Sequence, residues 1–457
     1  MRKSAYILLA AVGMTACNYL EIEPVGQVIP HKTSEFRALL TTGYYAYPFG
    51  SARTYTCLLS DEVATIDAGA FLNASEVVPL GYNFTWQYGG QMQEYPYQYF
   101  YQSMFYANAV IENIRDADVD DADEPMEQIL GEAYALRAYN HFELVNLYGK
   151  PYDPQTADSD RGIVLSDHID IEQSYRPTTV GAVYAHILDD IAQAEQLMSL
   201  EKQPDATRNY RFSREALAAF KARVMLYMQR WQEAYDLASA LIPKYELLDL
   251  NTLGEQTVRP WKAESSEAIL ALDRPFSYSG GDLMRACLLS QGILGLFDVQ
   301  NDCRYSYLKK IDISGDEGGS GMSGYGVDRS SSDRISIRAA EMYLIAAEAG
   351  SYLPEQLEAA RKYLADLGAA RLKPEALEAR RAEIEAMTAE ELRNEVADER
   401  AREFLMEGHR WLDLRRTTRP AITKTYDGSS YTLNANDSRY TLPFPQSAIA
   451  GNPDLND

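Results

Sequence analysis

The residues best suited to ligand chemistry in this sequence are aromatic. Tyr82, Phe84, Trp86 and Tyr88 alternate with a period of two, so an extended backbone would place all four rings on one side. A row of rings forms a surface on which a flat, partly apolar ligand can stack. The alternation therefore predicts a stacking platform at Tyr82, Trp86 and Tyr88, although the same rings could instead cover a neighbouring helix.

A second group of aromatic residues lies in residues 246–333, where helical periodicity weakens. Glycine, serine and tyrosine accumulate in this segment, which includes the pair Gly280 and Gly281. Binding residues concentrate in loops that a rigid scaffold carries. We therefore select Tyr278 and Tyr325 as candidate ligand contacts from the loops facing the platform.

The sequence lacks the common patterns of catalytic and metal sites. None of its five histidines belongs to an HExxH or comparable pair, no cysteine belongs to a CxxC pair, and there is no GxSxG nucleophile motif. We expect no catalytic residue, no metal and no cofactor. A glycosidase needs only two carboxylates at the right separation, so 67 acidic residues leave that possibility open. Glu399, Glu403 and Glu407 stand beside arginines and are more typical of ion-paired structure.

Three loop sequences imitate ligand-binding motifs. Residues 319–324 satisfy GxGxxG, but no apolar strand precedes them and no helix clearly follows, as phosphate binding would require. Residues 312–317 begin like a calcium loop, yet Glu317 occupies the glycine position, and the acidic run 116–125 also lacks that glycine. These patterns favour solvated loops, and whether a structural calcium binds stays open.

The composition narrows the class of partner. The chain has 457 residues, with 43 basic against 67 acidic side chains and a net charge of -24. That charge opposes binding to nucleic acid or to an anionic membrane surface, whereas a neutral ligand such as a sugar remains compatible. The 33 tyrosines combine flat apolar faces with hydroxyl groups, which suits a polar recognition surface.

Helical periodicity predicts the scaffold that must position these groups. Residues 213–242 form a predicted helical hairpin whose small and aromatic positions stand close to those of a tetratricopeptide repeat. The fold class is predicted as mostly α, with a tetratricopeptide-like helical-repeat scaffold and long insertions carrying little β structure. The scaffold occupies mainly residues 125–245 and 334–416, and the binding insertions about 55–100 and 246–333. Further helices are expected at residues 36–47, 125–148, 179–198, 335–349 and 357–367.

Residues 395–416 read EVADERAREFLMEGHRWLDLRR and predict one continuous helix. Its apolar stripe includes Ala397, Ala401, Phe404 and Leu412 at helical spacing, and its other faces carry charge. Charged residues three apart, such as Glu399 and Arg402, would be neighbours on that helix.

The amino terminus has the layout of a secretory signal. Basic residues are followed by an apolar run and then by Met14-Thr15-Ala16-Cys17, which is similar to a bacterial lipobox. We expect residues 1–16 to be a lipoprotein signal peptide, Cys17 to be lipidated, residues 17–34 to be a tether, and residues 35–457 to form one domain. If Cys17 is used in this way, Cys287 and Cys303 are able to pair, but buried free thiols explain them equally well.

Several of these segments together resemble one family. The run ERAREFLMEGHRWLDLRR closely resembles the C-terminal signature of the SusD/RagB family of surface nutrient-binding lipoproteins. The segment ALRAYNHFELVNLYGKPY, residues 135–152, and the tail YTLPFPQSAIAGNPDLND are also similar to that family.

The resemblance implies a lipid-anchored, non-enzymatic protein at the extracellular face of the outer membrane. Such a protein would capture oligosaccharides and deliver them to a partner SusC-type TonB-dependent transporter, closing over it as a lid. Two alternatives stay open: the same role for peptides, and a helical-repeat interaction scaffold without a small ligand.

Overall fold

The computed structural model describes residues 30–48, 51–66, 81, 84–88, 97–121, 123–169, 175–252, 258–275, 287–312, 323–327, 329–330, 332–426 and 428–456. Its longer helices are α1 (Thr33–Ala46), α2 (Ser51–Leu59), α4 (Tyr97–Asn113), α5 (Met126–Tyr148), α6 (Val180–Leu197), α7 (Arg214–Tyr227), α8 (Trp231–Leu241), α11 (Ala339–Ser351), α12 (Leu357–Ala369), α13 (Pro374–Ala386), α14 (Ala389–Glu403) and α15 (His409–Arg416). Short helices are α10 (Gln291–Leu294) and α16 (Gln446–Gly451).

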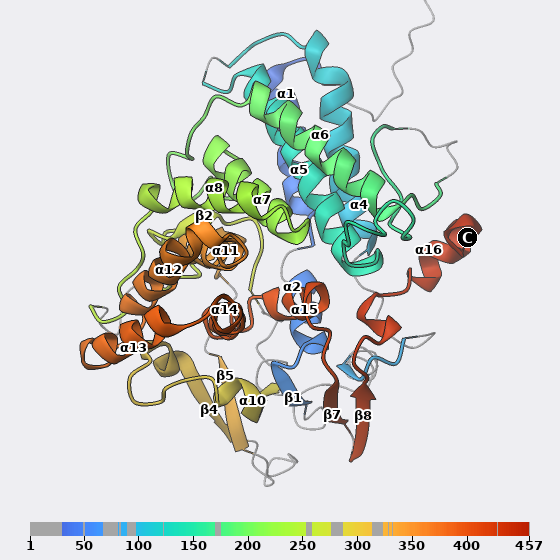
Figure 1. Cartoon of the computed structure of the whole chain (residues 1–457). Helices are drawn as coiled ribbons and strands as arrows, with labels where there is room; N and C mark the ends of the chain where they lie inside the picture. The colour runs from blue at the N-terminus through green and yellow to red at the C-terminus, as the bar shows by residue number, and fades with distance from the viewer. Residues whose placement is uncertain are drawn as a thin grey trace, which may run out of the picture.

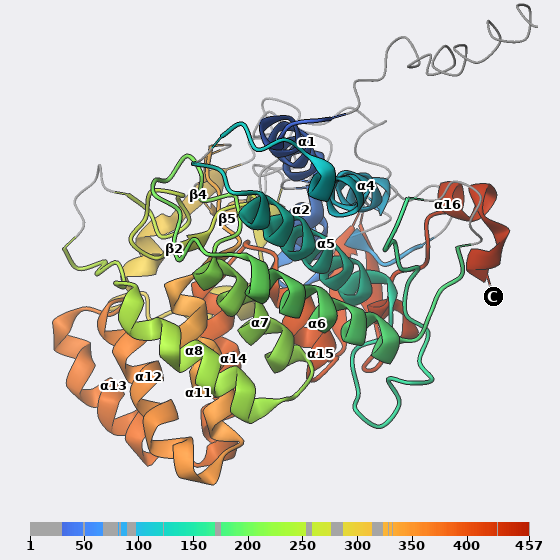
Figure 2. The same ribbon diagram turned by 90° about the horizontal axis from the view of Figure 1, so that it is seen from above.

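The helices form a layer of successive antiparallel neighbours. Figure 2 shows α4, α5, α6, α7, α8, α11, α12 and α13 side by side, and each packs on the next. This arrangement confirms the predicted mostly α fold with helical pairs of the tetratricopeptide type. Helices α14 and α15 lie beneath the layer, where α14 packs on α11 and α15 packs on α2.

Local signals place the helix ends where the sequence predicts them. The Thr179 and Ser213 hydroxyls accept hydrogen bonds from backbone N–H groups at the starts of α6 and α7, which satisfies donors that a helix leaves free. The predicted helix after Pro125 ends before Gly149. The described parts of the acidic run, residues 116–121 and 123–125, connect α4 to α5 as expected, and the Asp120 carboxylate accepts bonds from the first residues of α1.

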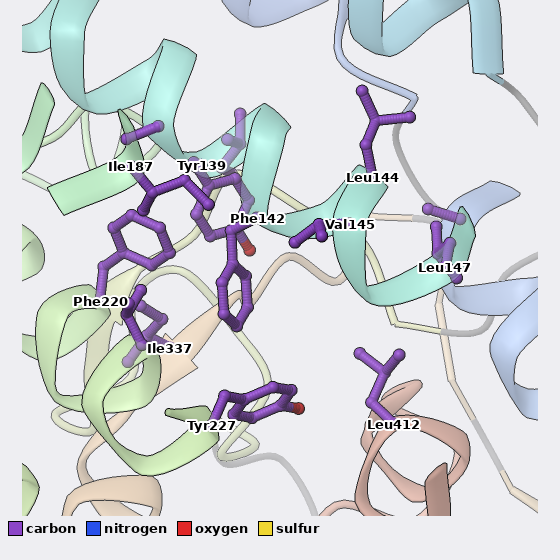
Figure 3. Packing of buried hydrophobic residues seen from close by; sticks show 14 of the residues in the cluster. Tyr139, Phe142, Leu144, Val145, Leu147, Ile187, Phe220, Tyr227, Ile337 and Leu412 are labelled. Atoms are coloured by element: carbon purple, nitrogen blue, oxygen red, sulfur yellow. The ribbon is translucent and has the colours of Figure 1, made fainter. Parts of the chain in front are cut away.

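The hydrophobic core centres on α5, which is buried on nearly every side. Tyr139 and Phe142 of α5 point toward α7, where they meet Phe220 and Tyr227 edge to face at ring-centroid distances of 5.1 and 5.0 Å (Figure 3). Edge-to-face pairs of this kind add stability beyond the area they bury. The aromatic core makes the α5–α7 part of the layer a rigid support for the loops around it.

Strands are short, and β1, β4, β5, β7 and β8 lie at the end of the molecule opposite α6, whereas β2 lies beside α8 and α11 (Figure 1). A four-stranded sheet has the order β3–β1–β7–β8, with β1 and β7 parallel and the other pairs antiparallel. Two further pairs, β2–β6 and β4–β5, are antiparallel. The strands are β1 (Val63–Ile66), β2 (Ala268–Leu270), β3 (Cys287–Leu289), β4 (Leu308–Asp312), β5 (Ser323–Val327), β6 (Ile337–Arg338), β7 (Ile422–Tyr426) and β8 (Ser429–Leu433).

The predicted single helix over residues 395–416 is wrong. Helix α14 ends at Glu403 and α15 begins at His409, because Met406 and Gly408 have φ angles of 58° and 84°. The Met406 N–H donates to the carboxylate of Glu62, 2.7 Å away. A contact from a distant part of the chain therefore stabilises the turn that divides the helix.

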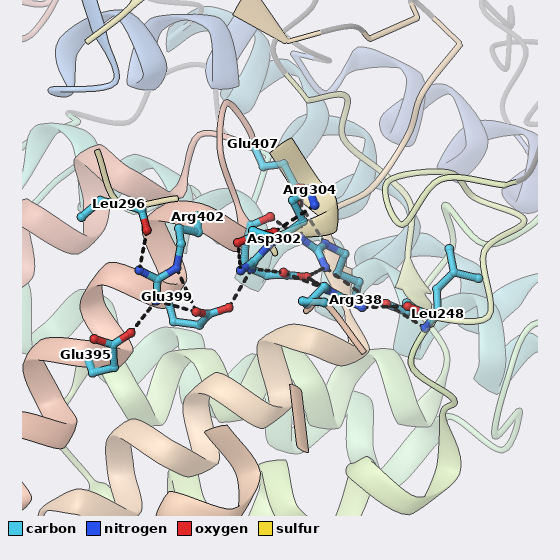
Figure 4. A network of polar contacts seen from close by, with 12 residues as sticks. Leu248, Leu296, Asp302, Arg304, Arg338, Glu395, Glu399, Arg402 and Glu407 are labelled. Atoms are coloured by element: carbon cyan, nitrogen blue, oxygen red, sulfur yellow. Dashed lines mark hydrogen bonds and ion pairs between the residues drawn. The ribbon is translucent and has the colours of Figure 1, made fainter. Parts of the chain in front are cut away.

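The charged faces of this region are buried rather than solvated (Figure 4). The Glu403 carboxylate contacts Arg304, Arg338 and Arg371, with nitrogen–oxygen distances of 2.5 to 3.0 Å. Although burial acts to raise the pKa of Glu403, these three guanidiniums hold that pKa well below its usual range. The prediction of ion-paired glutamates is confirmed, and Glu399 contacts Arg402 as expected. Glu403 and Glu407 instead take partners far along the chain.

Two further predictions concern the cysteines and the membrane. Cys57, Cys287 and Cys303 are free thiols, so the possible pair of Cys287 with Cys303 is not formed. Within the described residues, no helix combines the length and the apolar character that crossing a bilayer requires.

Candidate functional site

A cleft of about 870 Å³ lies between the loop after α5 and the C-terminal tail. Helix α16 leads away from it at the edge of the molecule (Figure 1). The cleft combines aromatic rings, hydroxyls, amides and charged groups. It is lined by Tyr88, Lys150, Pro151, Tyr152, Asp153, Thr156, Asp160, Arg161, Gln229, Arg416, Thr417, Arg419, Asn436, Asp437, Ser438, Arg439, Tyr440, Thr441, Leu442, Pro443, Phe444, Pro445 and Gln446.

Aromatic rings anchor the tail side of the cleft to the scaffold. Tyr440 stacks on Trp411 with a centroid distance of 4.8 Å, and Phe444 stacks on Tyr148 at 6.0 Å. The buried Arg415 donates to the backbone carbonyls of Tyr440 and Gly149, which ties the tail to the end of α5. These contacts hold the cleft wall in place without a ligand.

Most charges that line the cleft already have partners. Lys150 pairs with Asp160 at 2.5 Å and Arg439 pairs with Asp437 at 2.7 Å. Arg416 pairs with Glu348 and Asp413, which lie behind the cleft wall. Arg161 and Arg419 differ, because no carboxylate of the described residues lies within ion-pair distance of either. The Asp153 carboxylate accepts a backbone N–H and has no cationic partner there.

The backbone around the cleft adopts uncommon conformations. Gln229, Arg419 and Asn436 have positive φ angles of 59°, 42° and 56°, and all three line the cleft. Such conformations cost energy and cluster at functional sites, where the surrounding structure maintains them. Here the Asn436 N–H donates to the Arg419 carbonyl, 2.9 Å away, and the Asn436 side chain accepts a bond from the Arg419 guanidinium.

The structure places Trp86 in the core instead of on a platform. Trp86 is only 1% exposed, and its indole N–H donates to the Leu59 carbonyl. The backbone turns rather than extends here, because the Thr85 N–H donates to the Gly81 carbonyl as in a helix. The predicted alternation in an extended strand is therefore wrong for the described residues, and Trp86 has no exposed ring face for a ligand.

A buried lysine lies beside Trp86 and leads to a testable prediction. The Lys424 ammonium is 4.4 Å from the Phe84 ring centroid and 4.7 Å from that of Trp86, and burial lowers the pKa of Lys424 to about 7. The folded state therefore binds fewer protons than the unfolded state between about pH 7 and 10.5, so the contribution of Lys424 to stability rises with pH across that window. Below it, both states are protonated and the full cost of burying the charge remains.

We expect Lys424→Met to raise the free energy of unfolding near neutral pH by about 1–4 kcal/mol. Denaturant unfolding from pH 6 to 10 checks this, and the advantage of the variant should shrink as the pH rises. Lys362→Met is the control, because the Lys362 side chain is 71% exposed. An advantage of Lys424→Met that stays constant up to pH 10 would contradict the lowered pKa.

The other predicted contact residues lie in different places. Tyr88 is half-buried at the cleft, where its hydroxyl donates to the Arg439 carbonyl at 3.1 Å. Tyr325 lies on β5 with its ring 5.9 Å from that of Tyr305, away from the cleft lining. Cys17, Tyr82 and Tyr278 lie outside the described residues.

A second, more apolar pocket of about 320 Å³ lies between α4 and the C-terminal end. Tyr101, Phe105 and Tyr175 contribute rings to it, and Asn108 and Asn452 contribute amides. Its lining offers fewer polar groups for a hydroxyl-rich ligand than the cleft does. The cleft is therefore the better candidate for a polar ligand.

One group of residues has the composition of a metal site. His141, His186 and Asp190 have ligand atoms within 4.8 Å of one another, although His141 lies on another helix from the other two. The Ser166 N–H donates to His141 Nε2, and Asp190 is paired with Arg137 at 2.6 Å. A neutral His141 that accepts this bond carries its proton on Nδ1 and has no lone pair left for a metal. These donors do not fit a metal ion, and the group contributes to the core instead.

Sequence reasoning missed most cleft residues. Tyr152, Tyr440 and Phe444 lie within the segments that resemble the family. Nothing in those segments indicates that the three residues line a common site. Arg161 and Arg419 gave no local signal, because their lack of an acidic partner appears only in the folded chain. The lining combines segments that lie up to 358 positions apart in the sequence, from Tyr88 to Gln446.

Comparisons with family models give consistent results. A model described as "Starch-binding associating with outer membrane" matches residues 19–226, and the model of the SusD family matches residues 300–457. Among curated proteins, the chain is 29% identical over 147 residues to a SusD-like protein of Formosa agariphila, covering 31% of this chain. The matched stretch spans about a quarter of the length of that relative, 25%.

Solved structures with similar folds are also SusD-like. A SusD superfamily protein of Bacteroides thetaiotaomicron is 21% identical, with a TM-score of 0.74 and coverage of 93% of this chain and 99% of that chain. A SusD-like carbohydrate binding protein of Bacteroides vulgatus is 18% identical, with a TM-score of 0.68 and coverage of 93% and 97%. A protein described as a laminarin binding SusD-like protein is 19% identical, with a TM-score of 0.59 and coverage of 84% and 91%. At these identities the similarity concerns the fold.

Proposed function

The chain belongs to the SusD/RagB family, and on that premise we propose that it is a glycan-binding lipoprotein of the outer cell surface. In this proposal it captures oligosaccharides without cleaving them and delivers them to a SusC-type TonB-dependent transporter, over which it closes as a lid. The membrane-facing part of the proposal is supported by the lipobox-like sequence ending at Cys17 and by the description of the matching family model.

The observation that carries the proposal is the composition of the cleft. Sugars present hydroxyl groups together with apolar ring faces, so their sites combine aromatic rings with several hydrogen-bond donors and acceptors. Tyr152 offers a half-buried ring here, and Thr156, Asn436 and Ser438 offer neutral polar groups. The volume of about 870 Å³ lies in the range of small-molecule sites.

The proposal leaves two groups as further candidate contacts. Tyr88 contributes to the cleft itself. Tyr325, with Tyr82 and Tyr278, belongs to insertions that we propose as additional binding loops, on the grounds of their aromatic composition. Trp86 is a buried core residue and is not among them.

Calorimetric titration of the purified chain with oligosaccharides and with peptides tests the proposal. Starch and laminarin oligosaccharides are the first probes, because the family model and one structural neighbour carry those names. We expect saccharide binding and no peptide binding. Binding of peptides alone would favour the peptide alternative, and copurification with another protein without any saccharide affinity would favour an interaction scaffold.

Matched variants assign the binding to the cleft. Tyr152→Ala should weaken saccharide affinity by about tenfold, since stacking of a ring on an aromatic side chain contributes on the order of 1–3 kcal/mol. Phe105→Ala is the control, because Phe105 is 50% exposed and lines the second pocket. The opposite pattern, with only Phe105→Ala weakened, would place the ligand in the second pocket.

A further inference from the structure

The cleft holds two guanidiniums whose charge nothing in the described structure neutralises. Arg161 is exposed, and its guanidinium carbon lies 4.7 Å from the Phe444 ring centroid. Arg419 donates only to the neutral Asn436 side chain and to the Arg415 carbonyl. Against these two cations stands one carboxylate without a cationic partner, that of Asp153.

Local positive charge is unusual for this molecule. The chain carries a net charge of -24, and its other buried and half-buried arginines are largely compensated by carboxylates, as Arg37, Arg53 and Arg223 are. Arginine presents planar N–H groups that match the oxygens of a carboxylate or a sulfate. Two such groups that remain open toward a cleft form a recognition element for an anion.

The backbone holds both arginines in position. The Arg161 carbonyl accepts the Lys150 N–H at 3.2 Å, and the Arg419 N–H donates to the Leu414 carbonyl at 2.8 Å. Arg419 and Asn436 keep their positive φ angles while bonded to each other. A site whose strained backbone is braced in advance loses less entropy when a ligand binds.

We propose that the cleft binds saccharides that carry an anionic group, through Arg161 and Arg419. This inference rests on the proposed glycan-binding function and specifies its substrate class. The anionic group is a uronic acid carboxylate or a sulfate ester, which share the oxygen geometry that a guanidinium recognises. The neutral donors and the rings of the cleft contact the rest of the sugar chain.

Titration with three matched probes tests the proposal. The probes are an oligogalacturonide, the same oligosaccharide with its carboxyl groups reduced to neutral alcohols, and a sulfated galactan oligosaccharide. We expect at least one charged probe to bind about tenfold or more tightly than the neutral one, with an affinity that falls as ionic strength rises. The probe that binds more tightly identifies the carboxylate or the sulfate as the natural group.

Variants connect this preference to the two arginines. Arg161→Gln with Arg419→Gln should remove the preference for the charged probe. Arg208→Gln is the control, since the Arg208 side chain is exposed and does not line the cleft. Unfolding curves of the double variant check that the fold is retained, since Arg161 packs on the Phe444 ring and Arg419 donates to Asn436.

The outcomes distinguish failure of the anionic-ligand inference from failure of the proposed glycan-binding function. Equal affinity for charged and neutral probes, or a charged preference that survives in the double variant, overturns the inference and leaves glycan binding intact. Absence of binding to every saccharide, charged or neutral, overturns the proposed function together with the inference.

Discussion

Glu403→Gln is expected to lower the free energy of unfolding by about 3–5 kcal/mol, the cost of removing one partner from a buried ion pair. The Glu403 side chain is 1% exposed and contacts Arg304, Arg338 and Arg371. A neutral amide has one acceptor oxygen in place of two and no charge, so the three guanidiniums would be buried with insufficient compensation. Urea unfolding followed by circular dichroism measures the change.

The Glu403 carboxylate should also make the free energy of unfolding depend on pH. Because the three arginines hold the pKa of Glu403 well below the ordinary value of 4.5, its stabilising contribution is fully present above that pH and is lost as the pH falls below it. Glu403→Gln should therefore unfold with less pH dependence in the acidic range than the wild type. Glu383→Gln is the control, because the Glu383 side chain is 59% exposed and its pair with Arg380 should contribute little. Equal effects of the two substitutions would show that the buried network does not stabilise the fold.

Gly408→Ala is the second substitution with a large expected effect. Gly408 has a φ angle of 84° between α14 and α15, and an added Cβ would lie 2.6 Å from Arg53 Cδ and 3.1 Å from Arg53 Cα. Left-handed backbone costs a non-glycine residue about 1–2 kcal/mol, and overpacking a filled site about 1–3 kcal/mol. We expect the free energy of unfolding to fall by about 2–4 kcal/mol, measured by urea unfolding.

A glycine elsewhere provides a control with the opposite sign. An alanine Cβ at Gly368, in α12, would meet no atom within 4 Å. Gly368→Ala should therefore be neutral or raise the free energy of unfolding by up to about 1 kcal/mol, through the better helix propensity of alanine. A wild-type stability for Gly408→Ala would contradict the close approach of the α14–α15 turn to α2.

Local signals in the sequence sufficed for most of the helical layer. The caps at Thr179 and Ser213 and the stop at Gly149 act over one helical turn, and the structure follows them closely. The turn at residues 404–408 escaped prediction because its stabilising partner, Glu62, lies more than three hundred positions earlier in the chain. A helical pattern of apolar residues continues through that turn in the sequence, so periodicity alone extends the helix.

The candidate site was harder to predict for the same physical reason. A period of two at Tyr82 to Tyr88 predicts an extended strand, yet the Thr85 N–H donates to the Gly81 carbonyl and the Trp86 indole N–H donates to the Leu59 carbonyl. The cleft is lined mainly by residues 150–161, 416–419 and 436–446, which meet only after the tail docks on α5. Composition indicates an aromatic, polar recognition surface, and the fold supplies a candidate cleft for it and shows which charges in that cleft have no ionic partner.

We propose that this chain holds a saccharide without altering it. Incubation of the purified chain with a bound oligosaccharide, followed by chromatography of the recovered ligand, tests that claim most directly. We expect the chain to retain the saccharide during incubation. The saccharide recovered afterwards should have its original length. Recovery of shortened products, lost on substitution of a single carboxylate, would contradict it and identify the chain as a hydrolase.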